Sequence, residues 1–272
     1  MYEIVNLSNK NNGYYTYQLK RNKEVVMLLR AHKEREYRDA YVFRLIDTTP
    51  LNDINEIRTD WPVPYFMISR LIQEFLKNKI TEDILLIDAS DSRYNKIIKD
   101  FSFQLESNNY FGSIELDTLI YYLSTVTKTH AFKNYYPVTE YNKDALIKKV
   151  IEVYETNFEI QQKNKLPFPY WKKQLTNRLD SLNSVVLYPT KTIRGYALLY
   201  KDQFEVDLGQ IYYDSVDSKE LVISSLLASL RSMREEIDEV FLNIRAKDLY
   251  AMDLFKNLNK EELFAQSIYK KG

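Results

Sequence analysis

The stretch FLNIRAKDLYAMDLFKNLNK, residues 241–260, predicts a short strand followed by an amphipathic helix. Residues 240–244 form a mostly apolar run that is too short for a stable helix, so we expect a strand buried on both faces. Asp248 is well placed to cap the helix that follows. The apolar residues of this helix recur at spacings of three and four, as they do along one helical face. They are Leu249, Met252, Leu254, Phe255 and Leu258.

The same pattern occurs earlier in the chain. Residues 84–91 repeat the strand and its flanks, and Ala89 and Asp91 match Ala246 and Asp248. In both copies we expect a helix before this strand and two long strands before that helix. These helices are expected over residues 65–78 and 219–233, and the strands over 25–31, 40–46, 195–201 and 204–213. A repeat this long indicates a duplicated domain rather than a solenoid, whose repeats are much shorter.

The end of the predicted helix resembles the closing motif of the GCN5-related N-acetyltransferase (GNAT) superfamily. That motif usually reads A-x-x-L-Y-x-x-L-G-F or A-x-x-L-Y-x-x-x-G-F. Here it reads Ala251-x-x-Leu254-Phe255-x-x-Leu258-Asn259, with Phe255 where the superfamily usually has a tyrosine. The resemblance implies an α+β fold with three α/β layers, built as two tandem acyl-CoA N-acyltransferase-like halves.

We expect a degenerate GNAT-like domain over residues 1–123 and a complete one over residues 134–272. The first lacks room for the strand and two helices that open a GNAT half, so we expect it to be truncated. Its last strand is expected over residues 112–116, followed by a connector over residues 117–133. The second half is expected to begin with a strand over residues 135–139, helices over 143–158 and 171–182, and a strand over 184–188.

Composition excludes several classes of function. Lys plus Arg and Asp plus Glu both number 38, so no net charge favours a nucleic-acid or membrane partner. The chain has no cysteine, which removes disulfides and thiolate nucleophiles, and we expect a cytoplasmic protein. The two histidines, His32 and His130, stand without companion ligands, so no metal site is expected.

The resemblance implies acetyl-CoA as co-substrate, held where the strands over residues 204–213 and 240–244 splay apart. Its expected contacts are Tyr212, Tyr213, Ser215, Val216, Ser218, Lys219 and Asn243. The superfamily's usual phosphate loop, Q/R-x-x-G-x-G/A, is degenerate here. It has no glycine or arginine and contains the acids Asp214, Asp217 and Glu220. An alternative interpretation is that Asp217 and Glu220 form a capping box, which satisfies the same helix amides internally.

The catalytic residues implied by the resemblance are also altered. Phe255, and Ile98 in the first half, replace the tyrosine that commonly protonates the leaving thiolate. Tyr250, one turn earlier, is the candidate acid. Glu205 and Asp207 are the candidate bases, because a carboxylate on the central strand can accept the proton of an attacking ammonium. The alternative for both carboxylates is a solvent-facing side of the strand.

Three functions remain open on this basis. The first is an N-acetyltransferase that transfers an acyl group from acetyl-CoA to the amine of a small molecule, amino acid or peptide. The second is a catalytically inactive GNAT-fold binding or regulatory protein, which the altered loop and missing tyrosines favour. The third is an aminoacyl-tRNA-dependent transferase, which the neutral charge disfavours. We favour the enzyme by analogy, because duplicated proteins of this kind are more often enzymes.

Overall fold

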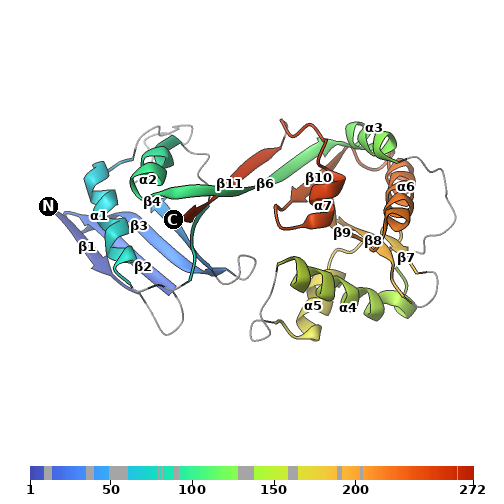
Figure 1. Ribbon diagram of the computed structural model, residues 1–272, viewed down its shortest axis with the longest axis horizontal. Helices are drawn as coiled ribbons and strands as arrows, with labels where there is room; N and C mark the ends of the chain where they lie inside the picture. Colours follow the sequence, from blue (N-terminus) through green and yellow to red (C-terminus); the bar gives the residue numbers. More distant parts are fainter. Residues whose placement is uncertain are drawn as a thin grey trace. The chain divides into compact units, whose positions relative to one another are not determined.

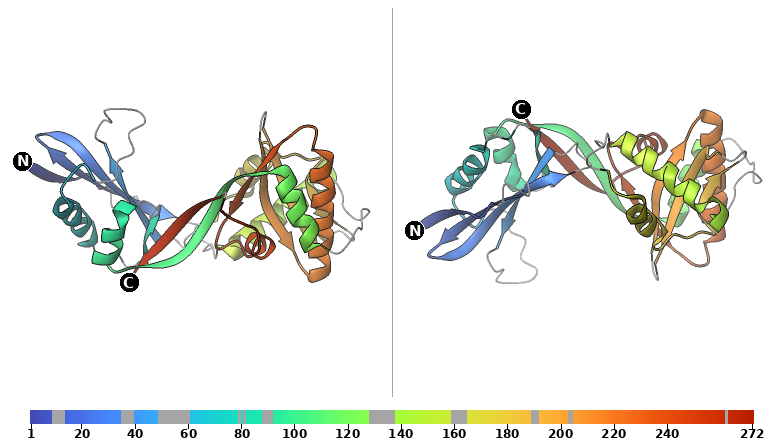
Figure 2. Two further views of the ribbon diagram at one scale, coloured as in Figure 1. Left: turned by 90° about the horizontal axis from the view of Figure 1, so that it is seen from above. Right: turned by 90° about the horizontal axis from the view of Figure 1, so that it is seen from below.

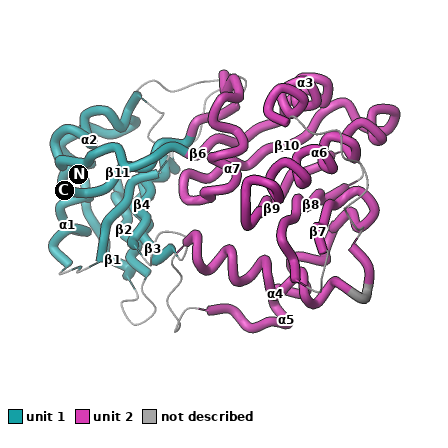
Figure 3. Tube along the Cα trace, turned by 45° about the vertical axis from the view of Figure 1, so that its right-hand side comes forward, with its two compact units in different colours: residues 1–108, 266–272 teal, residues 109–265 magenta. Residues whose placement is uncertain are grey.

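The structure is a computed structural model of the 272-residue chain, and it divides the chain into two compact units. Unit 1 comprises residues 1–108 and 266–272, and unit 2 comprises residues 109–265 (Figure 3). Each unit is a β-sheet covered by helices. The structure describes residues 1–8, 14–34, 40–48, 61–78, 80, 82–87, 92–127, 138–158, 165–188, 192–202, 205–261 and 263–272.

Unit 1 begins with an antiparallel run of strands and continues through a helix, a parallel strand and a second helix (Figure 1). Its elements are β1 (Tyr2–Asn6), β2 (Tyr14–Arg21), β3 (Glu24–Glu34), β4 (Ala40–Asp47), α1 (Tyr65–Leu76), β5 (Ile84–Ile87), the short 3-10 helix η3 (Ser92–Tyr94), α2 (Asn95–Asp100) and, from the end of the chain, most of β11 (Phe264–Lys271). Their order in the sheet is β1-β2-β3-β4-β5-β11, with β4 and β5 parallel.

Helices α1 and α2 cover one face of this sheet. The buried residues of α1 recur at spacings of three and four, so they form one stripe against the strands. They are Met67, Ile68, Leu71, Ile72 and Phe75. Phe75 lies 5.8 Å from Phe43 of β4, ring centre to ring centre, in the middle of this core. Burial of each such side chain contributes about 1.5–3 kcal/mol, so the α1 stripe is a main source of unit 1 stability.

Unit 2 contains the remaining elements. They are most of β6 (Phe103–Glu115), α3 (Leu116–Val126), α4 (Glu140–Asn157), α5 (Phe168–Thr176), β7 (Val185–Leu187), β8 (Gly195–Lys201), β9 (Val206–Tyr213), α6 (Val216–Ser232), β10 (Glu239–Ile244) and α7 (Leu249–Leu254). The sheet order is β6-β10-β9-β8-β7, and only β9 and β10 pair in parallel among its described pairs.

Unit 2 has three layers, with α4 and α5 on one face of the sheet and α6 on the other (Figure 2). Alternation along β8 shows this directly, because successive side chains of a strand point to opposite faces. Tyr196 and Leu198 lie in the core under α4, whereas Ala197 and Leu199 lie in the core under α6. The expected α+β fold with α/β layers is therefore confirmed.

The internal repeat is also confirmed. In unit 1, α1 connects β4 to the parallel strand β5, and α2 follows. In unit 2, α6 connects β9 to the parallel strand β10, and α7 follows. The strands that the sequence comparison aligned, β5 and β10, thus hold equivalent positions in their sheets.

The two sequence repeats exchange their last strands. β6 ends the first repeat but pairs with β10 of unit 2, and β11 ends the second repeat but pairs with β5 of unit 1. Residues 110–115 of β6 pair antiparallel with β10, and residues 268–270 of β11 pair antiparallel with β5. The strand expected over residues 112–116 is therefore much longer and does not close the first half. The unit boundaries consequently differ from the expected division at residues 1–123 and 134–272.

Other expectations need correction. Part of the expected connector is the helix α3, because Leu119, Ile120 and Leu123 form an apolar stripe buried in unit 2. The helix α5 runs from Phe168 to Thr176, so it begins and ends a few residues earlier than the helix expected over residues 171–182. Residues 128–137, with His130 and part of the strand expected over residues 135–139, lie outside the described residues.

Residues 241–260 form the predicted strand and the start of the predicted helix. Asp248 caps α7 by accepting from the backbone amides of Tyr250 and Ala251 at 3.2 and 3.1 Å. The helix is only six residues long, however, and Leu249 is exposed. β10 is buried on one face only, because α4 and α5 pack over β7 to β9 and leave Asn243 exposed.

Candidate functional site

The parallel strands β9 and β10 separate toward their carboxyl ends. Pairing covers only Val206–Leu208 opposite Val240–Leu242, although β9 continues to Tyr213 and β10 to Ile244. The register of β9 against β8 shifts between Ala197 and Leu199, which marks a β-bulge. A bulge bends a strand and increases its twist, so it accounts for the departure of β9 from β10. This open strand end is the candidate site.

Gly209 lies in this bulge and packs against Tyr200. A Cβ at this position would lie 2.3 Å from the Tyr200 ring, so only glycine allows the ring to lie across the strand. The Tyr200 hydroxyl donates to Gln210 Oε1 at 3.0 Å on the same face. The glycine is thus required by close approach rather than by a turn.

Three tyrosines meet at the open strand end. Tyr212 and Tyr213 end β9, and the Tyr250 ring of α7 lies edge-on to both, with ring centres 5.1 Å apart in each case. Burial raises the pKa of the Tyr250 hydroxyl above its ordinary value. The structure therefore brings together Tyr212, Tyr213 and Tyr250.

Lys219 is paired across the same opening. Its ammonium lies 2.5 Å from Asp253 Oδ2, and the Tyr213 hydroxyl donates to that same oxygen at 2.6 Å. The hydrogen bond from Lys219 lowers the pKa of Asp253, and the bond from Tyr213 adds to this effect. Burial first, and then the bond to Asp253, raises the pKa of Tyr213. Asp253 therefore links β9 and α6 to α7.

The start of α6 is capped by Ser215, not by the predicted capping box. Ser215 Oγ accepts from the Ser218 amide at 3.2 Å. Asp217 is exposed, and Glu220 accepts instead from Thr127 Oγ1 at 3.0 Å. The prediction failed because serine and aspartate cap about equally well, so residue type alone did not fix the first residue of the helix.

An arginine that sequence analysis missed lies beside this helix start. Arg194 Nε donates to Asp214 Oδ2 at 3.0 Å, and Arg194 Nη2 donates to Ser215 Oγ at 3.2 Å. The hydrogen bond to Arg194 lowers the pKa of Asp214. Because Gly195 pairs with Tyr213 across the β8–β9 hairpin, the preceding residue must lie beside Asp214. The register of this hairpin is the feature from which Arg194 could have been predicted.

The candidate bases lie far from this opening. Asp207 is near the start of β9, and its Oδ2 lies 3.4 Å from Nη2 of Arg178. Glu205 is exposed just before the strand. Six residues at about 3.3 Å each separate Asp207 from Tyr213 by roughly 20 Å. The structure does not bring Glu205 and Asp207 together with Tyr250.

Two other carboxylates lie nearer. Burial raises the pKa of Asp248, the cap of α7. On α4, Lys149 lies 2.9 Å from Glu152 and 4.7 Å from the centre of the Tyr212 ring. Burial lowers the pKa of Lys149, but hydrogen bonds to Glu152 and Tyr212 outweigh it and leave the pKa raised. Asp248 was predicted only as a cap, because its burial depends on the tertiary fold.

The remaining expected cofactor contacts vary in accessibility. Ser218 is 2% exposed and donates to Asp214 Oδ1 at 2.6 Å, whereas Val216 is 76% exposed. Asn243 is exposed on β10. Of the expected set, Lys219 and the tyrosines are therefore those grouped around the open strand end.

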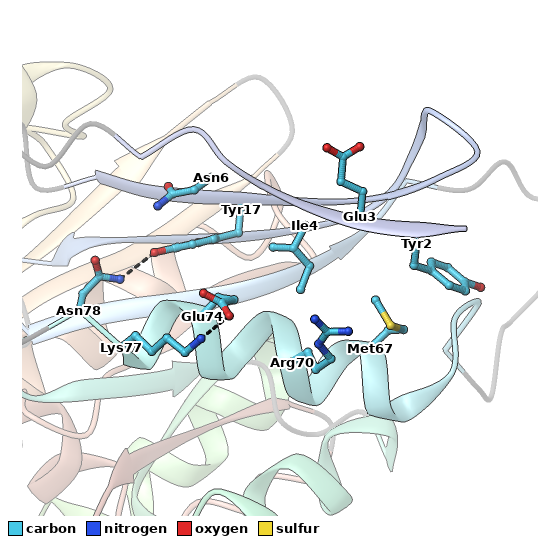
Figure 4. Close-up of a pocket in the computed structure, with 10 residues that line it drawn as sticks. All are labelled: Tyr2, Glu3, Ile4, Asn6, Tyr17, Met67, Arg70, Glu74, Lys77 and Asn78. Atoms are coloured by element: carbon cyan, nitrogen blue, oxygen red, sulfur yellow. Dashed lines mark hydrogen bonds and ion pairs between the residues drawn. The ribbon is translucent and has the colours of Figure 1, made fainter.

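Unit 1 contains a separate open pocket of about 540 Å³ between β1, β2 and α1 (Figure 4). Its lining mixes acids and bases, including the ion pair of Glu74 with Lys77 at 2.5 Å. Tyr17 lies at its floor and accepts from Asn78 Nδ2 at 2.7 Å. The pocket lies at the β1 edge of the sheet, away from the parallel pair of β4 and β5.

The described residues hold neither a cluster of metal ligands nor a membrane-spanning helix. They contain no group of His, Cys, Asp and Glu suited to hold a metal ion. In the same part of the chain, no helix is both long enough and apolar enough to cross a membrane.

Comparison with known proteins identifies the fold. The sequence matches no protein-family model and no curated protein. The structure is similar to a GCN5-related N-acetyltransferase from Sphaerobacter thermophilus, with a TM-score of 0.55, 11% identity, and coverage of 94% of this chain and 80% of that chain. It is also similar to a tandem GNAT protein from the clavulanic acid biosynthesis pathway, with a TM-score of 0.50, 9% identity, and coverage of 99% and 98%.

A GNAT-family acetyltransferase from Colwellia psychrerythraea gives the same TM-score of 0.50 at 9% identity, over 98% of both chains. These likenesses confirm that the chain has a tandem GNAT fold, a fold that acetyltransferases have. At this level of identity they bear on the fold alone.

Proposed function

We propose that this protein is an N-acetyltransferase that uses acetyl-CoA and binds it at the open strand end of unit 2. The observation that carries the proposal is the loss of pairing between β9 and β10 after Leu208 and Leu242, beside the start of a 17-residue helix. An opening between parallel strands admits an extended ligand, and the helix start offers amides and a positive dipole to phosphate.

In this proposal, residues on both sides of the opening contact the cofactor. The pyrophosphate would lie against the first turn of α6, at Ser215, Val216 and Ser218, with Lys219 as its cation. The acyl-bearing arm would pass Tyr212 and Tyr213 toward Tyr250, with Asn243 on the facing strand. The Lys219 side chain extends into the opening, since its ammonium lies 5.5 Å from the centre of the Tyr213 ring.

The chemistry requires a base and an acid. The acceptor amine loses a proton to a carboxylate and attacks the thioester carbonyl. The carbon–sulfur bond then breaks, and the CoA thiolate takes a proton from a hydroxyl. We assign the hydroxyl to Tyr250 and the carboxylate to Asp248, which accepts from the Tyr250 amide at 3.2 Å and whose pKa is raised by burial. Glu205 and Asp207 lie too far from Tyr250 to share this step.

The acceptor in this proposal is a small-molecule, amino-acid or peptide amine. We place the reaction in the cytoplasm, because a chain without cysteine forms no disulfides that an oxidising compartment would favour.

One observation favours the alternative of an inactive binding or regulatory protein. Both cations near the start of α6 are already paired with carboxylates, Arg194 with Asp214 and Lys219 with Asp253. A phosphate group would have to compete with both of these pairs. The two functions differ in whether thiol is released.

The test is calorimetric titration with acetyl-CoA, followed by thiol release with a panel of amines. We expect binding and amine-dependent thiol release, with Tyr250→Phe lowering the rate about 100-fold through loss of the acid. Tyr121→Phe is the matched control, because Tyr121 is 73% exposed on α3. Binding without thiol release from any amine would favour the inactive alternative.

A further inference from the structure

Side chains of α7 close the open strand end. Asp253 receives the Tyr213 hydroxyl of β9 and the Lys219 ammonium of α6 on one carboxylate oxygen, at 2.6 and 2.5 Å. The Tyr213 hydroxyl also lies 3.4 Å from the Tyr250 carbonyl oxygen. These contacts run from β9 and α6 to α7, across the region where β9 and β10 no longer pair.

We propose that Asp253, Tyr213 and Lys219 form a latch that competes with acetyl-CoA for the opening. The inference rests on the proposed function, since the latch blocks the place assigned there to the cofactor. Binding of the cofactor requires the ion pair between Asp253 and Lys219 to break. The Lys219 ammonium then pairs with a phosphate of the cofactor instead of the Asp253 carboxylate. The latch therefore sets the affinity of the site and makes it an autoinhibited one.

The two carboxylate–cation pairs near α6 are not equivalent. Asp214 and Arg194 come from adjoining ends of the β8–β9 hairpin, so their pair stays on one side of the opening. Asp253 comes from α7 and reaches across. A ligand that passes between α6 and α7 must therefore break the Asp253 pair, whereas the Asp214 pair competes only for the phosphate at the start of α6.

The latch opens by movement of side chains rather than of the helix. Ala251 and Leu254 anchor α7 in the unit 2 core, where they are 4% and 2% exposed. The Tyr122 hydroxyl also donates to the Leu254 carbonyl at 2.5 Å. By contrast, the Asp253 side chain is 42% exposed, and its contacts with Lys219, Tyr213 and Lys256 are all made by side chains. A rotamer change therefore suffices, and it requires no unfolding of α7.

The first experiment compares Asp253→Asn with Asp217→Asn by calorimetric titration with CoA. Both substitutions remove one negative charge near the start of α6, but Asp217 is exposed and lies outside the latch. We expect Asp253→Asn to bind CoA about 10-fold more tightly, because a lost competing contact of about 1.4 kcal/mol corresponds to that factor. Asp217→Asn should increase affinity less than Asp253→Asn does, because the exposed Asp217 makes no contact that the ligand must break and its charge is screened by salt.

A second pair of variants tests the latch without any change of charge. Tyr213→Phe removes the hydroxyl that holds Asp253 and keeps the ring, so we expect about three-fold tighter CoA binding. Tyr200→Phe is its control, because that hydroxyl bonds to Gln210 and not to the latch. Thermal unfolding of all four variants shows that each is folded when it is titrated.

The outcomes separate the latch from the function. Binding by the unaltered protein with no gain in Asp253→Asn or Tyr213→Phe would overturn the latch and leave the proposed function intact. An equal gain in Asp253→Asn and Asp217→Asn would also overturn it, because net charge would then explain both. Binding seen only in Asp253→Asn would support it strongly. No binding by any protein would overturn both proposals.

Discussion

Ser215 illustrates how one residue determines an element. Its hydroxyl satisfies the Ser218 amide, one of the donors that a helix leaves unpaired at its start. It also accepts from Arg194, so the cap joins the helix start to the β8–β9 hairpin. The neighbouring acids are not part of this cap.

We expect Ser215→Ala to lower the free energy of unfolding by about 0.5–2 kcal/mol, the usual cost of a lost cap. Asp217→Ala should change it by less than about 0.5 kcal/mol, because the side chain is exposed and makes no capping bond. Urea denaturation measures both. A larger loss in Asp217→Ala than in Ser215→Ala would restore the capping box.

Asp214 and Asp253 give the protein a defined response to acid. Both have pKa values lowered from the ordinary 3.8, mainly by hydrogen bonds from Arg194 and Lys219 respectively. A carboxyl whose pKa is lower in the folded state binds protons less readily there than in the unfolded state. Its contribution to stability is therefore complete above the unfolded value and is lost as pH falls through the lowered folded value.

We expect the melting temperature of the double variant Asp214→Asn, Asp253→Asn to lie below that of the unaltered protein at pH 5–7. The difference should shrink as pH falls below the ordinary value of 3.8, because these carboxylates then bind protons in the unfolded chain more readily than in the folded protein. Thermal melts across this range provide the measurement. A difference that stayed constant down to pH 3 would show that these ion pairs do not contribute as described.

At the scale of elements, β11 has the most unexpected role. It follows α7 in the chain but pairs with β5 of unit 1, and Ile268 is 1% exposed in a small core there. The other members of this core are Ala40, Val42, Leu85 and Ile87. Unit 1 therefore depends on residues from the far end of the chain.

Ile268→Ala should destabilise unit 1 by about 2–5 kcal/mol, the range for removing a buried branched side chain. Phe264→Ala is the control, since Phe264 lies on the same strand and is 71% exposed. Hydrogen exchange should show faster exchange in β4 and β5 for Ile268→Ala. Faster exchange confined to unit 2 would contradict the strand assignment.

At the scale of the whole molecule, the two halves share a topology. In unit 1, the parallel pairing of β4 and β5 likewise ends at Phe43 and Leu86, before β4 ends at Asp47. The Tyr94 hydroxyl lies 3.3 Å from the Leu45 carbonyl beside this end, while residues 49–60 lie outside the described part. The prediction that the first half is structural therefore remains a prediction.

Acetyl-CoA should protect unit 2 and leave unit 1 unchanged. We expect slower amide exchange over residues 206–219 and 240–250 on adding the cofactor, because a bound ligand reduces local opening. Exchange in β4, β5 and α1 should not change. Protection confined to unit 1 would move the cofactor site to the first half.

The sequence alone determined the repeated order of strands and helices, because periodicity and capping are local. The start of α7, its cap at Asp248 and the matching strands β5 and β10 all follow from residues a few positions apart. The family motif at Ala251 to Asn259 likewise predicted the fold. These features lie within single elements.

Only the tertiary structure decided which distant residues meet. Leu86 pairs with Tyr269, Arg194 with Asp214, and Asp253 with Lys219. The periodicity of the sequence does not encode such partners. Several strands could have paired with the same sheet edge, and several carboxylates could have paired with the same cation. The choice comes from burial and sheet geometry of the complete fold, and this is why the exchanged strands and the latch could not be predicted.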